Sequence, residues 1–264
     1  MTEPFKHKSP RQMMCLGEYS VTAGITTRQN GYSEVPYDSL NMGLHVEDCK
    51  DHVLRNRESL ADELQIPLNQ WVMAEQVHGT DIHVVKKEDG GRGAFDKNES
   101  IANADGLITN QKNLLLAAFY ADCVPLLFLD PKTQWIGLAH AGWKGTVHGM
   151  AEKMITKLTE QGASLNDIIM VIGPSISQRN YEVDQHVIDH IPEEYKEEVS
   201  ISKTGNKYLL GLKELNKRLA LDTGLNESHI YQTDLCTFEE DKLFYSHRRD
   251  HGRTGRMLAY IGLE

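Results

Sequence analysis

The sequence lacks the features of a secreted or membrane-spanning protein. Its cysteines form no Cys-x-x-Cys pair, and a chain of 264 residues can bury a hydrophobic core without disulfides. No segment approaches the apolar length of a membrane span, and the first residues contain no apolar signal core. We therefore expect a cytoplasmic protein with no membrane partner and with four reduced cysteines, Cys15, Cys49, Cys123 and Cys236.

Positive charge is also scarce, because 28 lysines and arginines face 38 aspartates and glutamates, for a net charge of −10. Nucleic acids are bound chiefly through clustered lysine and arginine, so the composition argues against a nucleic-acid partner. The one basic cluster is the segment RRDHGRTGR over residues 248–256. Any anion that the protein binds must meet such a local concentration of positive charge.

The chain shows no repeat, no low-complexity tract and no linker, so we expect one domain over residues 1–264. Short apolar runs separated by turns predict strands, and apolar residues at helical spacing predict helices. Hairpins mixed with separate helices indicate an α+β fold. The predicted strands cover 105–109, 114–123, 125–130, 135–141, 168–174, 243–250 and 255–263, and the predicted helices cover 51–64, 147–158 and 209–219.

Three fragments at predicted strand ends or turns concentrate reactive residues: EQVHGT with His78, YADCVPLLF with Cys123, and HAGWKGT with His140. Two neutral imidazoles and one thiolate form a good zinc ligand set that leaves a fourth position for water. The three residues lie 45 and 17 positions apart, which matches no compact zinc-finger spacing. On spacing alone, a buried inert cysteine and hydrogen-bonded core histidines explain the fragments better than a metal site does.

Further fragments accompany these three in a fixed order along the chain. They are TTRQNGYSEVPYDSLNMGLHV, NR, ADGLIT, IGPSISQRNYEV, DLCT and FYSHRRDHGRTGR. Together, the fragments resemble the YfiH family, also called laccase-domain purine nucleoside phosphorylases, over nearly the whole chain. The resemblance implies a single-domain four-layer α/β/β/α sandwich.

The resemblance also implies an enzyme that cleaves adenosine, inosine and methylthioadenosine with phosphate and that deaminates adenosine. Purine nucleosides and phosphate are then its partners, whereas the number of subunits stays open. The family's metal ligands fall on His78, Cys123 and His140, which are also the expected catalytic residues. Zinc is the usual metal, and copper is the alternative that accompanies a claimed phenol-oxidase activity.

Phosphorolysis requires a bound phosphate, and guanidinium groups match phosphate oxygens best. The candidate phosphate or substrate ligands are Arg28 and Ser33 in a glycine-bearing loop, Asn41 in SLNMG, and Arg248 and Arg249 in the basic segment. Deamination requires a carboxylate that moves a proton. Glu75 and Asp122 are the candidates, since they lie nearest to the ligands in sequence.

Three other functions remain open. Cys123 can act as a nucleophile with His140 as its base, which makes a cysteine hydrolase or deamidase and gives His78 no role. A copper phenol oxidase needs ligands for several copper ions, and the sequence offers one convincing trio. A non-catalytic protein with a structural metal needs a fourth protein ligand, which we do not find in the sequence.

Overall fold

The computed structural model describes residues 3–263 and contains two six-stranded sheets packed face to face. The predicted domain also includes residues 1, 2 and 264, which lie outside the described residues. The first sheet has the order β1-β2-β3-β15-β7-β4. Its strands are β1 (Lys6–Ser9), β2 (Gln12–Cys15), β3 (Val21–Thr26), β15 (Met257–Leu263), β7 (Leu115–Tyr120) and β4 (Trp71–Met73).

The second sheet has the order β14-β10-β8-β9-β6-β5. Parallel pairs occur only at its edges, where β14 pairs with β10 and β5 pairs with β6. Its strands are β14 (Ile230–Gln232), β10 (Ile169–Ile172), β8 (Val124–Asp130), β9 (Trp135–Ala141), β6 (Gly106–Thr109) and β5 (Ile82–Val84).

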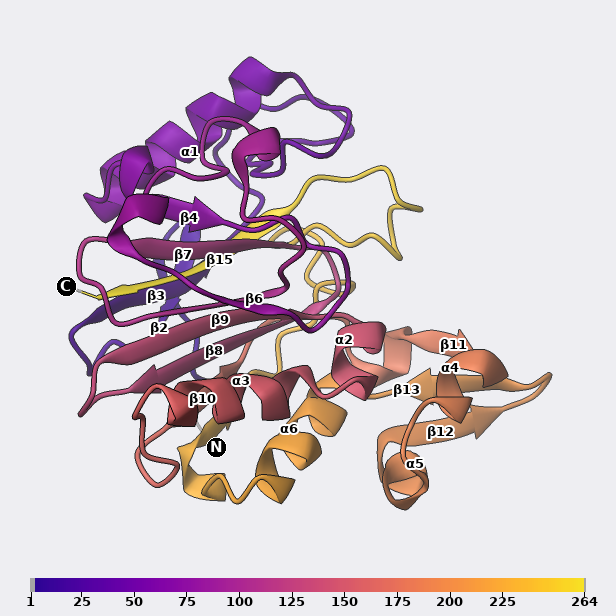
Figure 1. The fold of residues 1–264 in the computed structure, drawn as a ribbon. Coiled ribbons are helices and arrows are strands. Elements are labelled where there is room, and N and C mark those ends of the chain that lie inside the picture. The colour runs from indigo at the N-terminus through magenta and orange to yellow at the C-terminus, as the bar shows by residue number, and fades with distance from the viewer. Residues whose placement is uncertain (1–2, 264) are drawn as a thin grey trace.

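Helices cover the outer faces of the two sheets (Figure 1). The helix α1 (Lys50–Leu64) packs on the first sheet, whereas α3 (Met150–Glu160) and α6 (Leu212–Asp222) pack on the second. The short helix α2 (Trp143–Val147) follows β9 directly. Mixed sheets and helices confirm the expected fold class. Helices outside and sheets inside are also the arrangement that an α/β/β/α sandwich has.

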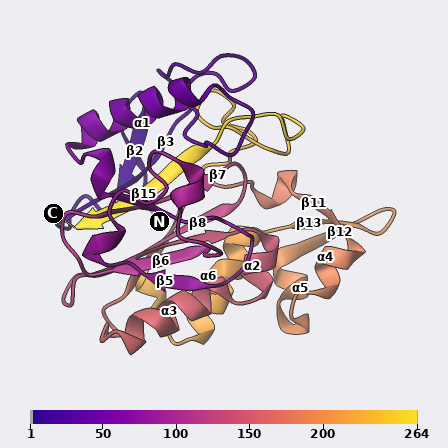
Figure 2. The ribbon, with the colours of Figure 1, turned by 45° about the horizontal axis from the view of Figure 1, so that its top comes forward.

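A smaller three-stranded sheet lies at one end of the molecule, beside α2, in both views (Figures 1 and 2). Its order is β11-β13-β12, with two helices packed on it. The elements are β11 (Glu182–Asp184), α4 (Gln185–Asp189), α5 (Glu193–Val199), β12 (Ser200–Lys203) and β13 (Lys207–Leu210). None of the helices in the described part of the chain has the length and apolarity to cross a bilayer.

Alternating side chains of the central strands fill separate cores, which explains the long apolar runs in the sequence. In β8, Leu127 and Leu129 enter the core between the sheets, while Leu126 and Phe128 enter the core under α3 and α6. In β7, Leu116 faces the other sheet, while its neighbours face α1. Strands buried on both faces therefore read as continuous hydrophobic sequence.

One predicted strand is wrong, because residues 243–250 form turns rather than a strand. Several of the segment's backbone N–H groups bond to side chains, and others form local turn hydrogen bonds, so no ladder with a neighbouring strand forms. Tyr245 N donates to Met257 Sδ, Arg248 N to Asp122 Oδ2, and Arg249 N to Ser246 Oγ. The predicted helix over 209–219 also starts too early, since Leu209 lies in β13 and the helix begins after Gly211.

Candidate metal centre

The topology brings His78, Cys123 and His140 to one edge of the paired sheets. The connection from β4 to β5 carries His78, and the connection from β7 to β8 carries Cys123, so both cross from the first sheet to the second. They leave the same edge because β4 and β7 are parallel neighbours. His140 is the penultimate residue of β9 and pairs with Pro125 at the start of β8, next to Cys123.

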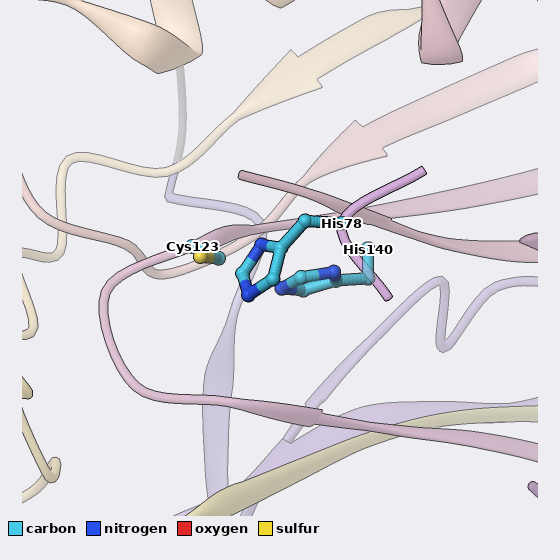
Figure 3. Close-up of side chains that lie close together, drawn as sticks. All are labelled: His78, Cys123 and His140. Carbon is cyan, nitrogen blue, oxygen red and sulfur yellow. The ribbon is translucent and has the colours of Figure 1, made fainter. Parts of the chain in front are cut away.

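The three side chains converge on one point (Figure 3). One donor atom from each residue lies within 4.8 Å of the others, and the two imidazole rings meet edge to face with their centroids 4.8 Å apart. A tetrahedral zinc ion needs roughly 3.3–3.6 Å between such nitrogen and sulfur donors. A shift of about 1 Å by the exposed His78 would close the set around an ion, so the cluster is compatible with a metal.

Gly142 leaves open space beside the donor atoms of His78 and Cys123. A Cβ on Gly142 would lie 2.9 Å from His78 Nδ1 and 3.1 Å from Cys123 Sγ. Among the described residues no fourth histidine, cysteine or carboxylate completes the group. Three protein donors with open space beside them fit a catalytic site better than a closed structural one.

The two histidines differ in their surroundings. His140 is 4% exposed, and although burial lowers its pKa, the neighbouring Cys123 and the hydrogen bond to Asp105 raise that pKa to about 9. Partial desolvation, together with the charge of His140, lowers the pKa of His78. Metal binding would therefore compete with a proton on His140, so we expect it to depend on pH.

Asp105 was not identified from the sequence, because only carboxylates that lie near the candidate ligands along the chain were considered. It precedes β6 and is buried, and its Oδ1 lies 2.8 Å from His140 Nδ1. The fragment ADGLIT that contains it belongs to the resemblance, yet 27 residues separate it from His78. Only the pairing of β6 with β9 reveals the contact.

A pocket of about 250 Å³ opens beside the cluster, with His78, Cys123 and Gly142 in its wall. Its apolar and aromatic lining comes from Trp143, Ile176, Tyr181 and Leu212, and its polar lining comes from Asp122 and Lys144. A mostly apolar cavity with a few polar groups is typical of a small-molecule site.

Asp122 lies in this pocket wall, but both of its carboxylate oxygens are engaged. Oδ1 accepts from the hydroxyl of Thr237 at 2.7 Å, and Oδ2 accepts from the backbone N–H of Arg248 at 2.7 Å. Glu75, the other proposed proton carrier, is exposed and does not line the pocket.

The predicted phosphate ligands divide into two groups. Arg248 does not line the pocket itself, but its guanidinium carbon lies 5.0 Å from the ring centre of Tyr181, which does. Its Nη1 donates to the carbonyl of Glu182 at 2.8 Å, and no carboxylate in the described chain forms an ion pair with it. Arg249 instead donates all five of its guanidinium N–H groups to three backbone carbonyls and to the Asp250 carboxylate.

The remaining candidates hold loops together and do not line the pocket. Arg28 donates to the carbonyls of Asp38 and Asp241. Ser33 Oγ accepts from Asn56. The fully buried Asn41 accepts from the backbone N–H groups of Gly43 and Arg256. Arg28, Ser33 and Asn41 therefore lie outside the pocket wall, and their role as phosphate ligands stays a prediction.

The sequence and fold are similar to those of known proteins over most of the chain. The family model described as "Multi-copper polyphenol oxidoreductase laccase" matches residues 22–264. The purine nucleoside phosphorylase YlmD of Bacillus subtilis (strain 168) is 44% identical over 247 residues, which are 92% of this chain and 89% of that protein. The protein of the same name from Geobacillus stearothermophilus is 45% identical over 244 residues, which are 91% of this chain and 89% of that one.

Two crystal structures share the fold over 100% of both chains. The Bacillus licheniformis hypothetical protein YfiH superposes with a TM-score of 0.97 at 42% identity. The YlmD of Geobacillus stearothermophilus superposes with a TM-score of 0.96 at 42% identity. The predicted resemblance to the YfiH family is thereby confirmed.

Proposed function

This chain belongs to the multi-copper polyphenol oxidoreductase laccase family, and on that premise we propose that it is a metal-dependent purine nucleoside phosphorylase. Adenosine, inosine and methylthioadenosine are the proposed substrates, with phosphate as the second substrate and adenosine deamination as a side activity. The observation that carries the proposal is the clustering of His78, Cys123 and His140 in the wall of a pocket. The names of the relatives supply the reaction.

We propose that His78, Cys123 and His140 hold one zinc ion and are the catalytic residues. Bound zinc would act as a Lewis acid and lower the pKa of water. The family name suggests several copper ions, but the described residues gather a single group of three suitable ligands. Four-electron reduction of oxygen needs more redox centres than that, so phenol oxidation is not the favoured activity.

The aromatic wall of the pocket suits a purine. Tyr181 and Trp143 both line it, and flat rings of this kind stack on nucleobases at about 1–3 kcal/mol per base. Ile176 and Leu212 supply further apolar contact. The base can therefore be held by stacking beside the metal centre.

Lys144 and Arg248 are the proposed phosphate ligands. Lys144 is the one cationic residue that lines the pocket, and neither side chain has a carboxylate partner among the described residues. In a protein of net charge −10, one cation in the pocket wall and a second beside the pocket residue Tyr181 favour an anionic ligand. Phosphate held there can attack the anomeric carbon as the glycosidic bond breaks, and the purine leaves with the electron pair and takes up a proton.

For the deaminase side activity, Asp122 is better placed than Glu75 because it reaches the pocket. Its two hydrogen bonds, to Thr237 and to the backbone of Arg248, fix the carboxylate beside Cys123. Proton transfer from this position requires that one of these bonds be exchanged for a bond to substrate or water.

One observation favours a second function. Cys123, His140 and Asp105 line up as a thiol, an imidazole and an orienting carboxylate, which is the order of a cysteine hydrolase or deamidase site. Such a triad would leave His78 without a role. The effect of removing His78 therefore separates the two functions.

Product analysis tests the proposal. Purified protein is incubated with adenosine, with and without phosphate, before and after metal removal by a chelator. Adenine and ribose 1-phosphate, formed only with phosphate and lost with the metal, are expected. Inosine alone would make the protein a deaminase, and activity that survives metal removal would favour the cysteine triad.

A further inference from the structure

Asp105 is a buried carboxylate that lies behind the metal centre rather than in the pocket. Its side chain has no exposed area, and it comes immediately before β6 in the second sheet. A carboxylate in such a place is costly unless its oxygens are hydrogen-bonded. The partners of these oxygens therefore show what the residue does.

All four hydrogen bonds of the Asp105 carboxylate run to the two histidine segments of the centre. Oδ1 contacts His140 Nδ1 at 2.8 Å and accepts from His78 N at 3.1 Å. Oδ2 accepts from Val77 N at 3.0 Å and from Gly79 N at 2.7 Å. One carboxylate thus connects the strand that carries His140 with the loop that carries His78.

The contact with His140 determines which ring nitrogen faces the other ligands. A carboxylate accepts only, so Nδ1 must carry a proton to bond to Asp105. Nε2 is then the nitrogen available to a metal beside Cys123 and His78. In the opposite tautomer, Nε2 would carry the proton and would have no lone pair available to bind a metal.

The contacts with residues 77–79 hold the backbone of the His78 loop. His78 has φ of 59°, in the left-handed region that residues other than glycine seldom adopt. Three successive N–H groups around one carboxylate stabilise this turn, because such a concave set of donors binds an anion. The imidazole of His78 is thereby aimed toward Cys123 (Figure 3).

We propose that Asp105 is the positioning residue of the metal centre, which sets the tautomer of His140 and the loop conformation of His78 together through one carboxylate. The inference rests on the proposed metal site and is independent of the substrate. It predicts that Asp105→Asn damages metal binding. Every partner is an N–H donor, so an amide NH₂ must face at least one of them and cannot accept from it.

Asp130 provides a matched control. Its carboxylate is also buried and accepts from three backbone N–H groups, those of Lys132, Thr133 and Ser164. It lies at the far end of β8 and β9 from Cys123 and His140. Asp130→Asn therefore also places an amide among buried N–H donors, but without a link to a metal ligand.

Zinc affinity is measured for the wild type, Asp105→Asn and Asp130→Asn by competition with a chelator. We expect affinity to fall about 10–100-fold in Asp105→Asn, as for other carboxylates that orient a histidine ligand. Asp130→Asn should keep the wild-type affinity. Wild-type affinity and an unchanged absorption spectrum of the cobalt-loaded protein in Asp105→Asn would overturn the proposal.

A second measurement needs no variant and stands even if Asp105→Asn fails to fold. Nitrogen-15 chemical shifts of the histidine rings identify the tautomer in the zinc-loaded wild type. We expect His140 to be protonated at Nδ1 and coordinated through Nε2. Coordination through Nδ1 would contradict the proposal. Since neither measurement uses a nucleoside, a zinc-binding protein without phosphorylase activity would overturn the proposed function alone.

Discussion

Single residues of the metal centre differ in how firmly the fold holds them. His140 is buried in a central strand, Cys123 is half-buried in a turn between the sheets, and His78 is exposed on a loop. In the proposed metal site, the exposed His78 is expected to move toward an ion, while the buried His140 provides a fixed position. Removing any of the three should weaken metal binding through loss of one donor atom. The free energy of unfolding should change most for the buried residue and least for the exposed one.

Cys123→Ala should lose both zinc and phosphorolysis, because the thiolate is the only anionic and soft donor of the three. His78→Ala should behave in the same way and leave stability nearly unchanged, since the side chain is exposed. Elemental analysis and product formation are measured on both variants, with Cys49→Ala as the control because Cys49 is exposed and outside the cluster. Full zinc occupancy in Cys123→Ala together with an active His78→Ala would support the cysteine triad instead.

Lys144→Ala should raise the KM for phosphate about 10- to 100-fold and leave the KM for the nucleoside nearly unchanged, since it removes a charge-assisted contact of ~1.5–3 kcal/mol. Lys132→Ala is the matched control, because Lys132 is paired with Asp167 and sits at the far end of β8 and β9. Arg28→Ala should lower stability without a selective effect on phosphate, because Arg28 bonds to loop carbonyls. A phosphate-specific defect in Arg28→Ala, with none in Lys144→Ala, would instead support the sequence-based prediction that Arg28 binds phosphate.

Elements with regular hydrophobic spacing were predicted well from the sequence. The helix expected over 51–64 is α1, and the strands around Cys123 and His140 lie where the apolar runs placed them. The strand expected over 243–250 is wrong because Tyr245 N and Arg248 N bond to side chains distant in sequence, which no local pattern reveals, while other backbone groups form turns. Likewise, the helix expected over 147–158 divides at Gly149, whose φ of 78° separates α2 from α3.

The site was predictable only in part, for a similar reason. Cysteine and histidine are chemically distinctive, so the trio stood out within its fragments and the fold gathers it. Arginine and aspartate are common at surfaces and in loops, so their roles depend on contacts across the chain. Arg249 uses its N–H groups in hydrogen bonds that hold loops together. Asp105 is hydrogen-bonded to both histidine segments.

The hairpin between β8 and β9 offers a test of stability that is separate from function. Burial raises the pKa of Asp130, but hydrogen bonds from the backbone N–H groups outweigh burial and hold that pKa below its ordinary value of 3.8. A depressed pKa means that the ionised carboxylate stabilises the folded state above pH 3.8, and that this stability is lost as pH falls through the folded pKa.

Asp130→Asn should therefore lower the free energy of unfolding by ~1–3 kcal/mol at neutral pH, since a buried donor loses its acceptor. The difference from wild type should shrink as pH falls below about 4, because the unfolded wild-type chain then takes up a proton at Asp130 more readily than the folded protein does. Urea unfolding of both proteins between pH 3 and pH 7 measures this difference in the free energy of unfolding. A difference that stays constant over this range would show that the charge of Asp130 does not stabilise the hairpin.

At the scale of the whole molecule, the two sheets form a rigid frame and the site lies where chain crossings join them. Both crossings, from β4 to β5 and from β7 to β8, leave the same edge, so their ligands meet without any long excursion of the chain. The net charge of −10 disfavours polyanions, and we expect Lys144 in the pocket wall, with Arg248 beside Tyr181, to attract a small anion. These charges are consistent with the proposed enzyme, which transfers phosphate to part of a small-molecule substrate.

Zinc titration of the metal-free protein tests the central claim most directly. Ribose 1-phosphate formation from inosine and phosphate is followed as zinc is added in substoichiometric steps. We expect activity to be absent without metal, to rise linearly with zinc and to level off at about one ion per chain, since one three-ligand site is available. Full activity in the metal-free protein, or no activity at one zinc per chain, would contradict the account.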